Sequence, residues 1–424
     1  MQKYLSKLPN QLQKLILELA ELAQRKHFSI YLVGGFVRDL LLGVRNLDLD
    51  IVVEQDGIAF AEEVKRKLNA RLILHRRFKT ATVIAANHLK IDIATCRQEY
   101  YPEPASLPVV TPSNLRDDLY RRDITINAMA ISLKGEDFGR LLDFFGGKSD
   151  LDNKVIRVLH SKSFIDDPTR ILRVIRFEQR YGFRIERNTL SFLKEAVREG
   201  MLHRVQPQRI RDELILLLKE ENPLLPIKRL NNLVGFGFLK EGFVLTEYNL
   251  RLLNNIRRQI IWYNTLGPRN RALDSWLIYF LGIIESLQPA EAKILSQNLA
   301  LRKGEKKRIL TYKGISRNII DELSSSGCRP SCVFRLLRDL SYEVIILLRA
   351  RYKNKNLWKN IEDFLCGYNS VRLHIGGEDL KELGLKEGPH FQRILNEVLM
   401  AKLDLGLKTK EDELDFARKI ISSK

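Results

Sequence analysis

The spacing of apolar residues divides the chain into two parts with different predicted structures. Up to about residue 145, short runs rich in β-branched and aromatic residues are separated by polar stretches, which predicts strands. The predicted strands are Ser29–Val33, Leu49–Val53, Arg71–His75, Ala81–Ala86, Leu89–Ala94 and Met129–Leu133. Helical spacing of apolar residues over Tyr4–Lys26 and Ile58–Asn69 adds two helices. This mixture predicts an α+β fold with a small mixed sheet in the first part.

After Gly147 the apolar residues recur at helical spacing and strand signals are few, which predicts an all-helical remainder. The predicted helices are Pro168–Tyr181, Asn188–Glu199, Gln208–Glu221, Leu250–Tyr263, Leu273–Ser286, Pro289–Leu299, Cys332–Tyr352, Leu357–Phe364, Gly388–Leu399 and Thr409–Ser422. In the first part, the prolines of Tyr101–Pro112 predict an extended loop. We expect a first domain at 1–145, followed by helical segments at 146–225, 226–330 and 331–424.

Composition narrows the environment of the protein. We find no stretch of about 18 apolar residues that is free of charge, and the first residues have no apolar core with a cleavage site, so neither a membrane span nor a leader is expected. The cysteines at 96, 328, 332 and 366 complete no zinc-ligand set. They predict reduced thiols in a cytoplasmic protein.

Charge changes the picture more than composition does. The chain has 71 Lys and Arg against 52 Asp and Glu, a formal net charge of +19. This surplus favours a polyanionic partner, because Lys and Arg that neutralise phosphates release condensed counterions. Between Leu301 and Asn360, fifteen Lys and Arg stand against five Asp and Glu. A short charge run is usually a solvated helix face, but a surplus concentrated in one segment predicts a nucleic-acid surface.

Two glycines and three acids carry the densest chemical signal. A predicted strand ends in Gly34-Gly35 and opens a helix, so that backbone N–H groups can approach phosphate oxygens closely. Asp48 and Asp50 are two residues apart on the next strand and project to the same side, where two carboxylates repel unless a cation lies between them. Mg²⁺ fits this requirement, and Asp92 on a later apolar strand supplies a third acid. These residues predict two-metal nucleotidyl transfer with Asp48 and Asp50 as metal ligands.

Two motifs connect this signal to a family. The pattern Gly34-Gly35-x-x-Arg38-Asp39, followed by Asp48-x-Asp50, resembles the head of the DNA polymerase β nucleotidyltransferase superfamily. The run Arg-Arg-Asp-Ile-Thr-Ile-Asn-Ala-Met-Ala at 121–130 resembles class II tRNA nucleotidyltransferases and bacterial poly(A) polymerases, with Ile where Phe is usual. The resemblance implies a catalytic head over 1–145, then a helical neck, body and tail. It also implies nucleotide binding by Gly34, Gly35, Arg38, Arg122, Asp123 and Asn127.

The run Asp-Asp-Pro-Thr-Arg at 166–170 resembles the Glu-Asp-x-x-Arg segment that opens the family's neck helix, with Asp in place of the first Glu. Asp167 can accept a hydrogen bond from an exocyclic amine, and Arg170 can donate to the ring nitrogen beside it. This pair would accept cytosine and adenine and reject uracil and guanine. The alternative is that Asp167 only caps the helix. Arg173, one turn further, is expected to assist with phosphate.

The resemblance leaves several activities open. His75–Val83 departs from the pattern of CCA-adding enzymes, with Lys79 in place of glycine, and also resembles the Arg-Arg-Phe run of bacterial poly(A) polymerases. The segment Gly377–Pro389 resembles the tail of bacterial tRNA nucleotidyltransferases. It favours CCA addition from CTP and ATP, with contacts to the acceptor end and elbow of tRNA. Addition of A alone, of CC alone and poly(A) tailing are alternatives. The stretch Thr95-x-Arg97-x-Glu99-x-Tyr101 and its Pro-rich continuation resemble the family's flexible loop, and the presence of this loop disfavours addition of CC alone.

Two other classes of protein fit the motifs less well. A non-catalytic RNA-binding protein on a decayed polymerase fold would have lost a metal carboxylate, whereas all three acids are present. A nucleotidyltransferase that acts on small molecules would share the glycines and acids but not the long basic helical arm.

Overall fold

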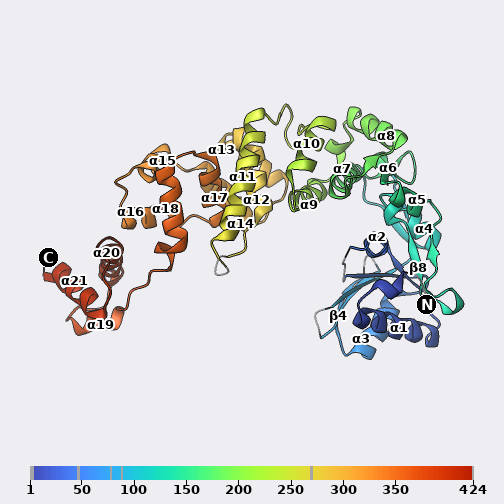
Figure 1. The fold of residues 1–424 in the computed structure, drawn as a ribbon, viewed down its shortest axis with the longest axis horizontal. Helices are drawn as coiled ribbons and strands as arrows, with labels where there is room; N and C mark the ends of the chain where they lie inside the picture. The colour runs from blue at the N-terminus through green and yellow to red at the C-terminus, as the bar shows by residue number, and fades with distance from the viewer. Residues whose placement is uncertain (1–3, 45–47, 77–78, 87–88, 268–270, 423–424) are drawn as a thin grey trace. The chain divides into compact units, whose positions relative to one another are not determined.

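The computed structural model describes residues 4–44, 48–76, 79–86, 89–267 and 271–422 of the 424-residue chain. Contacts separate it into two units, Met1–Glu241 and Gly242–Lys424 (Figure 1). In the described ranges every strand belongs to the first unit, and the second unit is helical. None of the helices in these ranges is both long and apolar enough to cross a lipid bilayer. The finer division into four segments stays a prediction.

A seven-stranded mixed sheet organises the start of the first unit, in the order β3-β4-β5-β2-β1-β8-β9. The strands are β1 Ile30–Val33, β2 Leu49–Val53, β3 Arg71–His75, β4 Thr80–Ile84, β5 Lys90–Thr95, β8 Ala130–Ser132 and β9 Leu141–Leu142. Strands β2 and β5 pair in parallel, and the other neighbours are antiparallel. All six strands predicted from the apolar pattern are confirmed, with small shifts of their ends.

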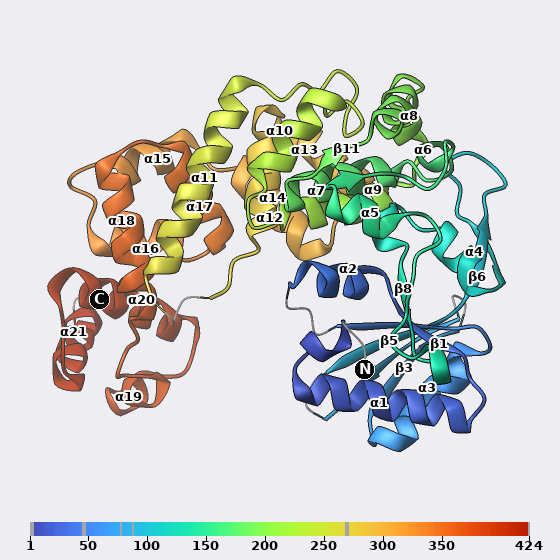
Figure 2. The same cartoon turned by 45° about the vertical axis from the view of Figure 1, so that its right-hand side comes forward.

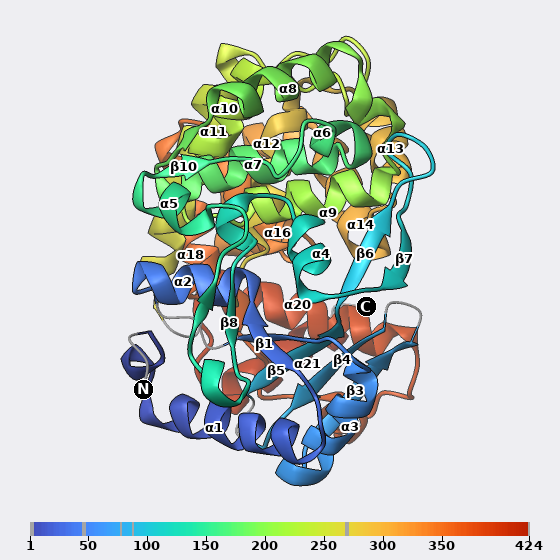
Figure 3. The same cartoon turned by 90° about the vertical axis from the view of Figure 1, so that its right-hand side faces the viewer.

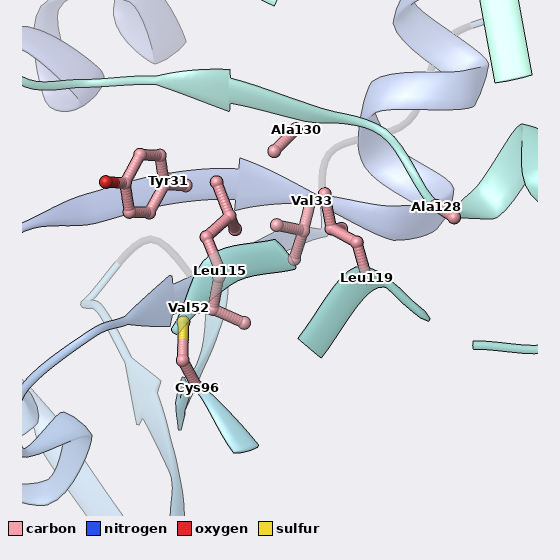
Figure 4. Close-up of a cluster of buried hydrophobic side chains, with 8 residues drawn as sticks. All are labelled: Tyr31, Val33, Val52, Cys96, Leu115, Leu119, Ala128 and Ala130. Carbon is pink, nitrogen blue, oxygen red and sulfur yellow. The ribbon is translucent and has the colours of Figure 1, made fainter. Parts of the chain in front are cut away.

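Helices cover both faces of this sheet. On one face α3 (Gly57–Leu68) packs against β3, β4 and β5, and α1 (Asn10–Arg25) packs against α3 (Figures 2 and 3). On the other face α4 (Leu115–Tyr120) contributes to a buried apolar cluster (Figure 4). The cluster consists of Tyr31, Val33, Val52, Cys96, Leu115, Leu119, Ala128 and Ala130. Helix α4 covers only part of its face, which leaves neighbouring strand residues open to solvent.

A short hairpin occupies much of the predicted loop over Tyr101–Pro112. Strands β6 (Arg97–Tyr100) and β7 (Val109–Pro112) pair antiparallel in a sheet of their own. The final proline is tolerated because an edge strand does not need its N–H group. The tip of the hairpin is bonded to the neck, since the Ala105 N–H group donates to the Ile165 carbonyl at 3.0 Å.

The rest of the first unit is a mainly helical neck. Its helices are α5 Gly147–Asp152, α6 Ser163–Asp166, α7 Thr169–Tyr181, α8 Arg187–Arg198, α9 Pro207–Leu218 and α10 Leu224–Leu233. Two residues each of β10 (Val155–Ile156) and β11 (Arg184–Ile185) form a parallel pair. Helix α7 packs against both α9 and α10. A mixed-sheet head followed by helices confirms the predicted α+β fold.

The second unit is a succession of helices. Their bounds are α11 Glu247–Thr265, α12 Ser275–Ile283, α13 Pro289–Asn298, α14 Lys303–Lys313, α15 Arg317–Ser324, α16 Pro330–Leu337, α17 Tyr342–Arg351, α18 Lys355–Cys366, α19 Gly377–Glu382, α20 Pro389–Leu405 and α21 Lys410–Ser422. The prediction of one helix over Cys332–Tyr352 is wrong, because the chain forms α16 and α17 there. Ser341 separates them by capping α17, where its hydroxyl accepts from the Val344 N–H group at 3.4 Å.

Candidate active site

A glycine turn brings strand β1 against an arginine from further along the chain. Gly34 opens α2 (Gly34–Leu42) with a φ of +68°, a conformation that glycine adopts without strain. A Cβ atom at this position would lie 2.7 Å from the Nη1 atom of Arg122. The turn therefore allows a guanidinium group to pack on the backbone at the start of a helix, where N–H groups attract phosphate.

Three polar side chains form one row across neighbouring strands. Asp50 on β2 lies opposite Asp92 on β5, and Asp92 lies opposite Thr82 on β4. The Thr82 hydroxyl donates to Asp92 at 2.6 Å, and the Lys90 ammonium group pairs with the other carboxylate oxygen. Asp48 directly precedes β2 and is exposed. The register of the sheet thus brings Asp50 and Asp92 side by side. Asp48, the third predicted acid, precedes Asp50 by two residues.

The environment of Asp50 favours a cation. Burial raises the pKa of the Asp50 carboxyl to about 6; the positive charge of Arg122 opposes this rise, and the charges of Asp92 and Asp48 add to it. Among the described residues, no three Asp, Glu, His or Cys side chains are gathered as a complete metal-binding group. Mg²⁺ does not need such a group, because it is commonly held by one or two carboxylates together with substrate phosphates and water. The donor set therefore fits Mg²⁺ bound together with a nucleotide.

A pocket of about 370 Å³ adjoins the acid pair. It is lined by Gly34, Gly35, Asp50, Glu99, Tyr101, Arg121, Arg122, Asp123, Asn127, Asp167, Arg170 and Arg173. The head and the neck both contribute, since Asp167 lies just before α7 and Arg170 and Arg173 lie within it. Of the predicted site residues, Asp48, Asp92 and Arg38 are not part of this lining, and Asp92 lines a second pocket next to it.

Arg38 supports the pocket from behind. Its buried guanidinium group donates to the Asn127 side-chain oxygen at 2.6 Å and lies over the Tyr181 ring, 5.0 Å from the centroid. The Asn127 amide in turn donates to Asp123 at 3.0 Å. Arg38 thus reaches the pocket through Asn127 rather than directly.

Asp123 is buried but ionised, because neighbouring groups stabilise its negative charge. Burial opposes its ionisation, but the charge of Arg173 and the Asn127 amide hold the pKa of Asp123 at about 2. Arg173 donates to Asp123 through Nε at 2.9 Å and Nη2 at 2.7 Å, and through Nη1 to Glu213 at 2.8 Å. Arg173 therefore holds a pocket carboxylate in place, and most of its donors are used within the protein.

Asp167 makes the capping contacts allowed for it by the sequence with one of its two carboxylate oxygens. Its Oδ1 atom accepts from the Thr169 N–H at 3.1 Å and from the Thr169 hydroxyl at 2.6 Å, and pairs with Arg209 at 2.7 Å. Within the described residues, no donor contacts Oδ2, which leaves that oxygen for a ligand in the pocket. Arg170 donates from Nη1 to Ser163 and from Nη2 to the Arg121 carbonyl, both at 2.7 Å, so three of its five N–H groups remain.

Comparisons with known proteins show the family of the chain. Residues 30–157 match the poly(A) polymerase head domain family. An A-adding tRNA nucleotidyltransferase of Halalkalibacterium halodurans is 32% identical over 424 residues, which cover 98% of this chain and 94% of that protein. The chain belongs to the tRNA nucleotidyltransferase family.

Further members of this family match over nearly the whole chain. The A-adding tRNA nucleotidyltransferase of Geobacter sulfurreducens is 36% identical over 421 residues, 98% of this chain. The chain spans 48% of that relative's own length. The structure of the Thermotoga maritima CCA-adding enzyme complexed with tRNA-CCA is 36% identical, covers 100% of this chain and 98% of that chain, and has a TM-score of 0.74.

Four residues of the candidate site were not predicted from the sequence. Arg121, Glu99 and Tyr101 line the pocket, and Arg209 holds Asp167. Glu99 and Tyr101 alternate along β6 and its continuation, so a period of two was the available signal. Glu99 accepts from Arg121 at 3.0 Å and from the Tyr101 hydroxyl at 3.1 Å. The signal was hidden because the surrounding prolines favoured a loop.

The cations of the basic segment 301–360 are only partly exposed. Arg349 lies over the Trp262 ring, 3.5 Å from the centroid, and is buried. Arg308 pairs with Asp274 at 2.6 Å, and Arg351 pairs with Glu285 at 2.9 Å. These cations stabilise the helices of the second unit. The exposed cations of the segment include Arg302, Lys303, Lys307, Arg329, Lys353, Lys355 and Lys359.

Proposed function

We propose that this protein adds C and A nucleotides from CTP and ATP to the 3′ end of tRNA without a template. The observation that carries the proposal is the 370 Å³ pocket, in which the head carboxylate Asp50 and the neck pair Asp167 and Arg170 line the same space. A nucleotide bound there would have its triphosphate near the acid pair and its base near the neck. Protein groups then replace the template strand.

The chain's own residues divide the work of the reaction. The Gly34-Gly35 turn and Arg122 hold phosphate oxygens, and Asp123 and Asn127 face the sugar. The 3′-oxygen of the RNA attacks the α-phosphorus, a new P–O bond forms, and pyrophosphate leaves. Asp48 and Asp50, with Asp92, would hold Mg²⁺, which supplies activation of the 3′-hydroxyl and charge compensation for the leaving group.

Selection of the base follows from hydrogen-bond complementarity. The Oδ2 atom of Asp167 accepts from the exocyclic amine of cytosine or adenine, and Arg170 donates to the adjacent ring nitrogen. Uracil and guanine present the opposite pattern, so they would leave buried polar groups unpaired. Arg209 and Thr169 support this selection because they fix the other oxygen of Asp167.

Addition of the terminal A alone is the second candidate. The Halalkalibacterium and Geobacter relatives are named A-adding, whereas the Thermotoga structure is of a CCA-adding enzyme, and the identities to this chain are similar. The two activities share the same chemistry and differ in whether the pocket accepts CTP.

The test is an extension assay with Mg²⁺ on three tRNA transcripts that end at the discriminator base, at C and at CC. Each receives CTP, ATP or both. Extension of the first transcript by CCA followed by arrest supports the proposal. Addition of one A only to the CC-ended transcript makes the protein an A-adding enzyme. Unlimited A tracts on any RNA, or no extension with wild-type protein, contradict both candidates.

A catalytic variant separates chemistry from binding. Asp50→Asn should abolish extension, and the same variant should bind tRNA in a filter assay as the wild type does. Chelation of Mg²⁺ with EDTA should stop extension in the same way, with recovery when Mg²⁺ is added back. Turnover of the variant near that of the wild type would remove Asp50 from the catalytic centre.

A further inference from the structure

Arg38 is held by the head and by the neck at once. Its buried guanidinium group donates to Asp39 through Nε at 2.8 Å and to the Asn127 side-chain oxygen through Nη1 at 2.6 Å. The same group lies over two rings of α7, 5.4 Å from the centroid of Phe177 and 5.0 Å from that of Tyr181. An aromatic face attracts a cation, so these rings restrict where the guanidinium group can lie.

The neighbours of Asn127 determine which way its amide points. A guanidinium group only donates hydrogen bonds, so the Asn127 atom that faces Arg38 is the oxygen. The ionised Asp123 carboxylate only accepts, so the Asn127 atom that faces it is the nitrogen, at 3.0 Å. This bond uses one amide hydrogen, and within the described residues no acceptor contacts the other. Asn127 lines the 370 Å³ pocket, so the second hydrogen is available to a ligand there.

Asp123 has no comparable capacity left. Its two oxygens accept from four donors, which are the Ile124 N–H group, the Asn127 amide, and the Nε and Nη2 atoms of Arg173. A carboxylate has about four lone-pair positions, so these donors use its capacity within the protein. Of the two head residues expected to face the sugar, Asn127 is therefore the one that can bond to a sugar hydroxyl.

The contacts form a ring that begins and ends on α7. From Tyr181 the ring runs through Arg38, Asn127 and Asp123 to Arg173, which lies about two turns before Tyr181 on the same helix. Displacement of Arg38 would release the oxygen of the Asn127 amide and let the amide rotate. Tyr181 does not line the pocket, so it acts on a ligand there through this ring of contacts.

We propose that Tyr181 is a positioning residue for the selection of ribonucleotides, an inference that rests on the proposed nucleotidyl transfer. Its ring holds Arg38, Arg38 fixes the Asn127 amide, and the amide donates its second hydrogen to the 2′-hydroxyl of the incoming nucleotide. This hydroxyl is the one that separates the nucleotides of RNA from those of DNA. A deoxynucleotide offers no acceptor there, so the buried N–H group would stay unpaired.

Variants of two neighbouring rings test the proposal. Tyr181→Leu removes the ring, whereas Tyr181→Phe keeps the ring and removes the hydroxyl. Phe183→Leu is the matched control, because the Phe183 ring lies 5.6 Å from that of Tyr181 and, among the described residues, makes no contact with Arg38. Equilibrium dialysis with Mg²⁺ and without RNA gives the Kd for ATP and for dATP. Tyr181→Leu should lower the preference for ATP over dATP by about fivefold or more, and the other two variants should keep it within about twofold of the wild-type value.

Base selection separates positioning from a general distortion of α7. In Tyr181→Leu the preference for ATP over GTP, measured in the same way, should stay within about twofold of the wild-type value, because Asp167 and Arg170 keep their contacts. Equal loss of both preferences overturns the proposal, since α7 would then have moved as a whole. A Tyr181→Leu protein that is folded by circular dichroism and keeps the wild-type preference for ATP over dATP also overturns it, as does an equal effect of Phe183→Leu.

Wild-type protein supplies a test that is independent of any folding defect. It should bind dATP more weakly than 3′-dATP, by about fivefold or more, because only dATP lacks the 2′-hydroxyl. Equal binding of the two analogues, or weaker binding of 3′-dATP, overturns the role of the Asn127 amide. Wild-type protein that shows the expected binding but adds no nucleotide to any tRNA contradicts the proposed function instead.

Discussion

Arg173 on α7 bonds both to Glu213 on α9 and to Asp123, a carboxylate that lines the 370 Å³ pocket. Two of its nitrogens, at 2.9 and 2.7 Å, donate to a single Asp123 oxygen, and the third donates to Glu213 on α9 at 2.8 Å. Asp123 is 7% exposed, so its charge depends on this partner. The position of this head carboxylate is therefore set by α7, the helix that carries Arg170 and begins just after Asp167.

Replacing Arg173 should weaken both folding and nucleotide binding. Arg173→Ala leaves Asp123 and Glu213 without their shared cation, which we expect to lower the free energy of unfolding by about 3 kcal/mol. Urea denaturation followed by circular dichroism measures this change. Arg180→Ala, on the same helix, removes a more exposed ion pair with Glu220 and should cost about 0.5–1 kcal/mol. Equal decreases in the free energy of unfolding would show that Arg173 contributes no more to stability than a surface ion pair does.

Alanine variants of two glycines with the same backbone conformation can separate the effect of backbone strain from an effect on activity. Gly34 and Gly43 have φ values of +68° and +71°, but a Cβ atom meets Arg122 only at Gly34, and nothing lies within 4 Å at Gly43. Both alanine variants should lose about 1 kcal/mol of stability. Only Gly34→Ala should lower kcat/KM, by about a hundredfold, because it displaces a phosphate-binding guanidinium. Comparable activities in an extension assay would contradict this role of the turn.

Asp167→Asn separates helix capping from base selection. Asparagine retains an oxygen for the Thr169 N–H group but can place an amide donor where the Oδ2 atom would accept. We expect little change in stability and a reduced preference for CTP and ATP over UTP and GTP, by about tenfold or more. The control is Asp56→Asn, which alters the cap of α3 in the head. An Asp167 variant with the wild-type preference would leave the residue only its structural role.

The exposed cations of the second unit should bind tRNA electrostatically. Lys303→Glu combined with Lys307→Glu on α14 should raise the KM for tRNA about fivefold and make it less sensitive to salt. The same charge change at Lys7 and Lys14 in the head serves as the control. Kinetics at several NaCl concentrations measure both quantities. Similar effects of the two double variants would indicate a general charge effect rather than a binding surface.

The strands were predicted well because β propensity and the spacing of apolar residues are properties of each short run itself. Runs such as Leu49–Val53 are β-branched and buried on a sheet, so period and propensity agree. The single helix predicted over Cys332–Tyr352 failed because a continuous apolar pattern concealed the cap at Ser341. A single capping residue within an apolar run is a weaker sequence signal than the hydrophobic periodicity around it.

The candidate site was predictable to the extent that its residues lie in short motifs. The acids, the glycine turn and the neck pair are recognisable in sequence, and the structure gathers all of them except Asp48 around two adjoining pockets. Arg209 could not be assigned in this way, since its importance comes from Asp167, a partner distant in the chain. Arg38 was predicted as a site residue from its motif, but its contact with Asn127, 89 positions away, could not be inferred from the sequence.

The row of Asp50, Asp92 and Thr82 makes chemical competence a property of strand register. A slip of β5 by one residue would turn Asp92 towards the face that α3 covers and bring Ile91 or Ile93 to the open face. Both isoleucines are fully buried, so the slip would expose an apolar side chain and bury a charge at once. The hydrophobic effect that fixes the strand register during folding therefore also places the acids of the candidate site side by side, before any substrate binds.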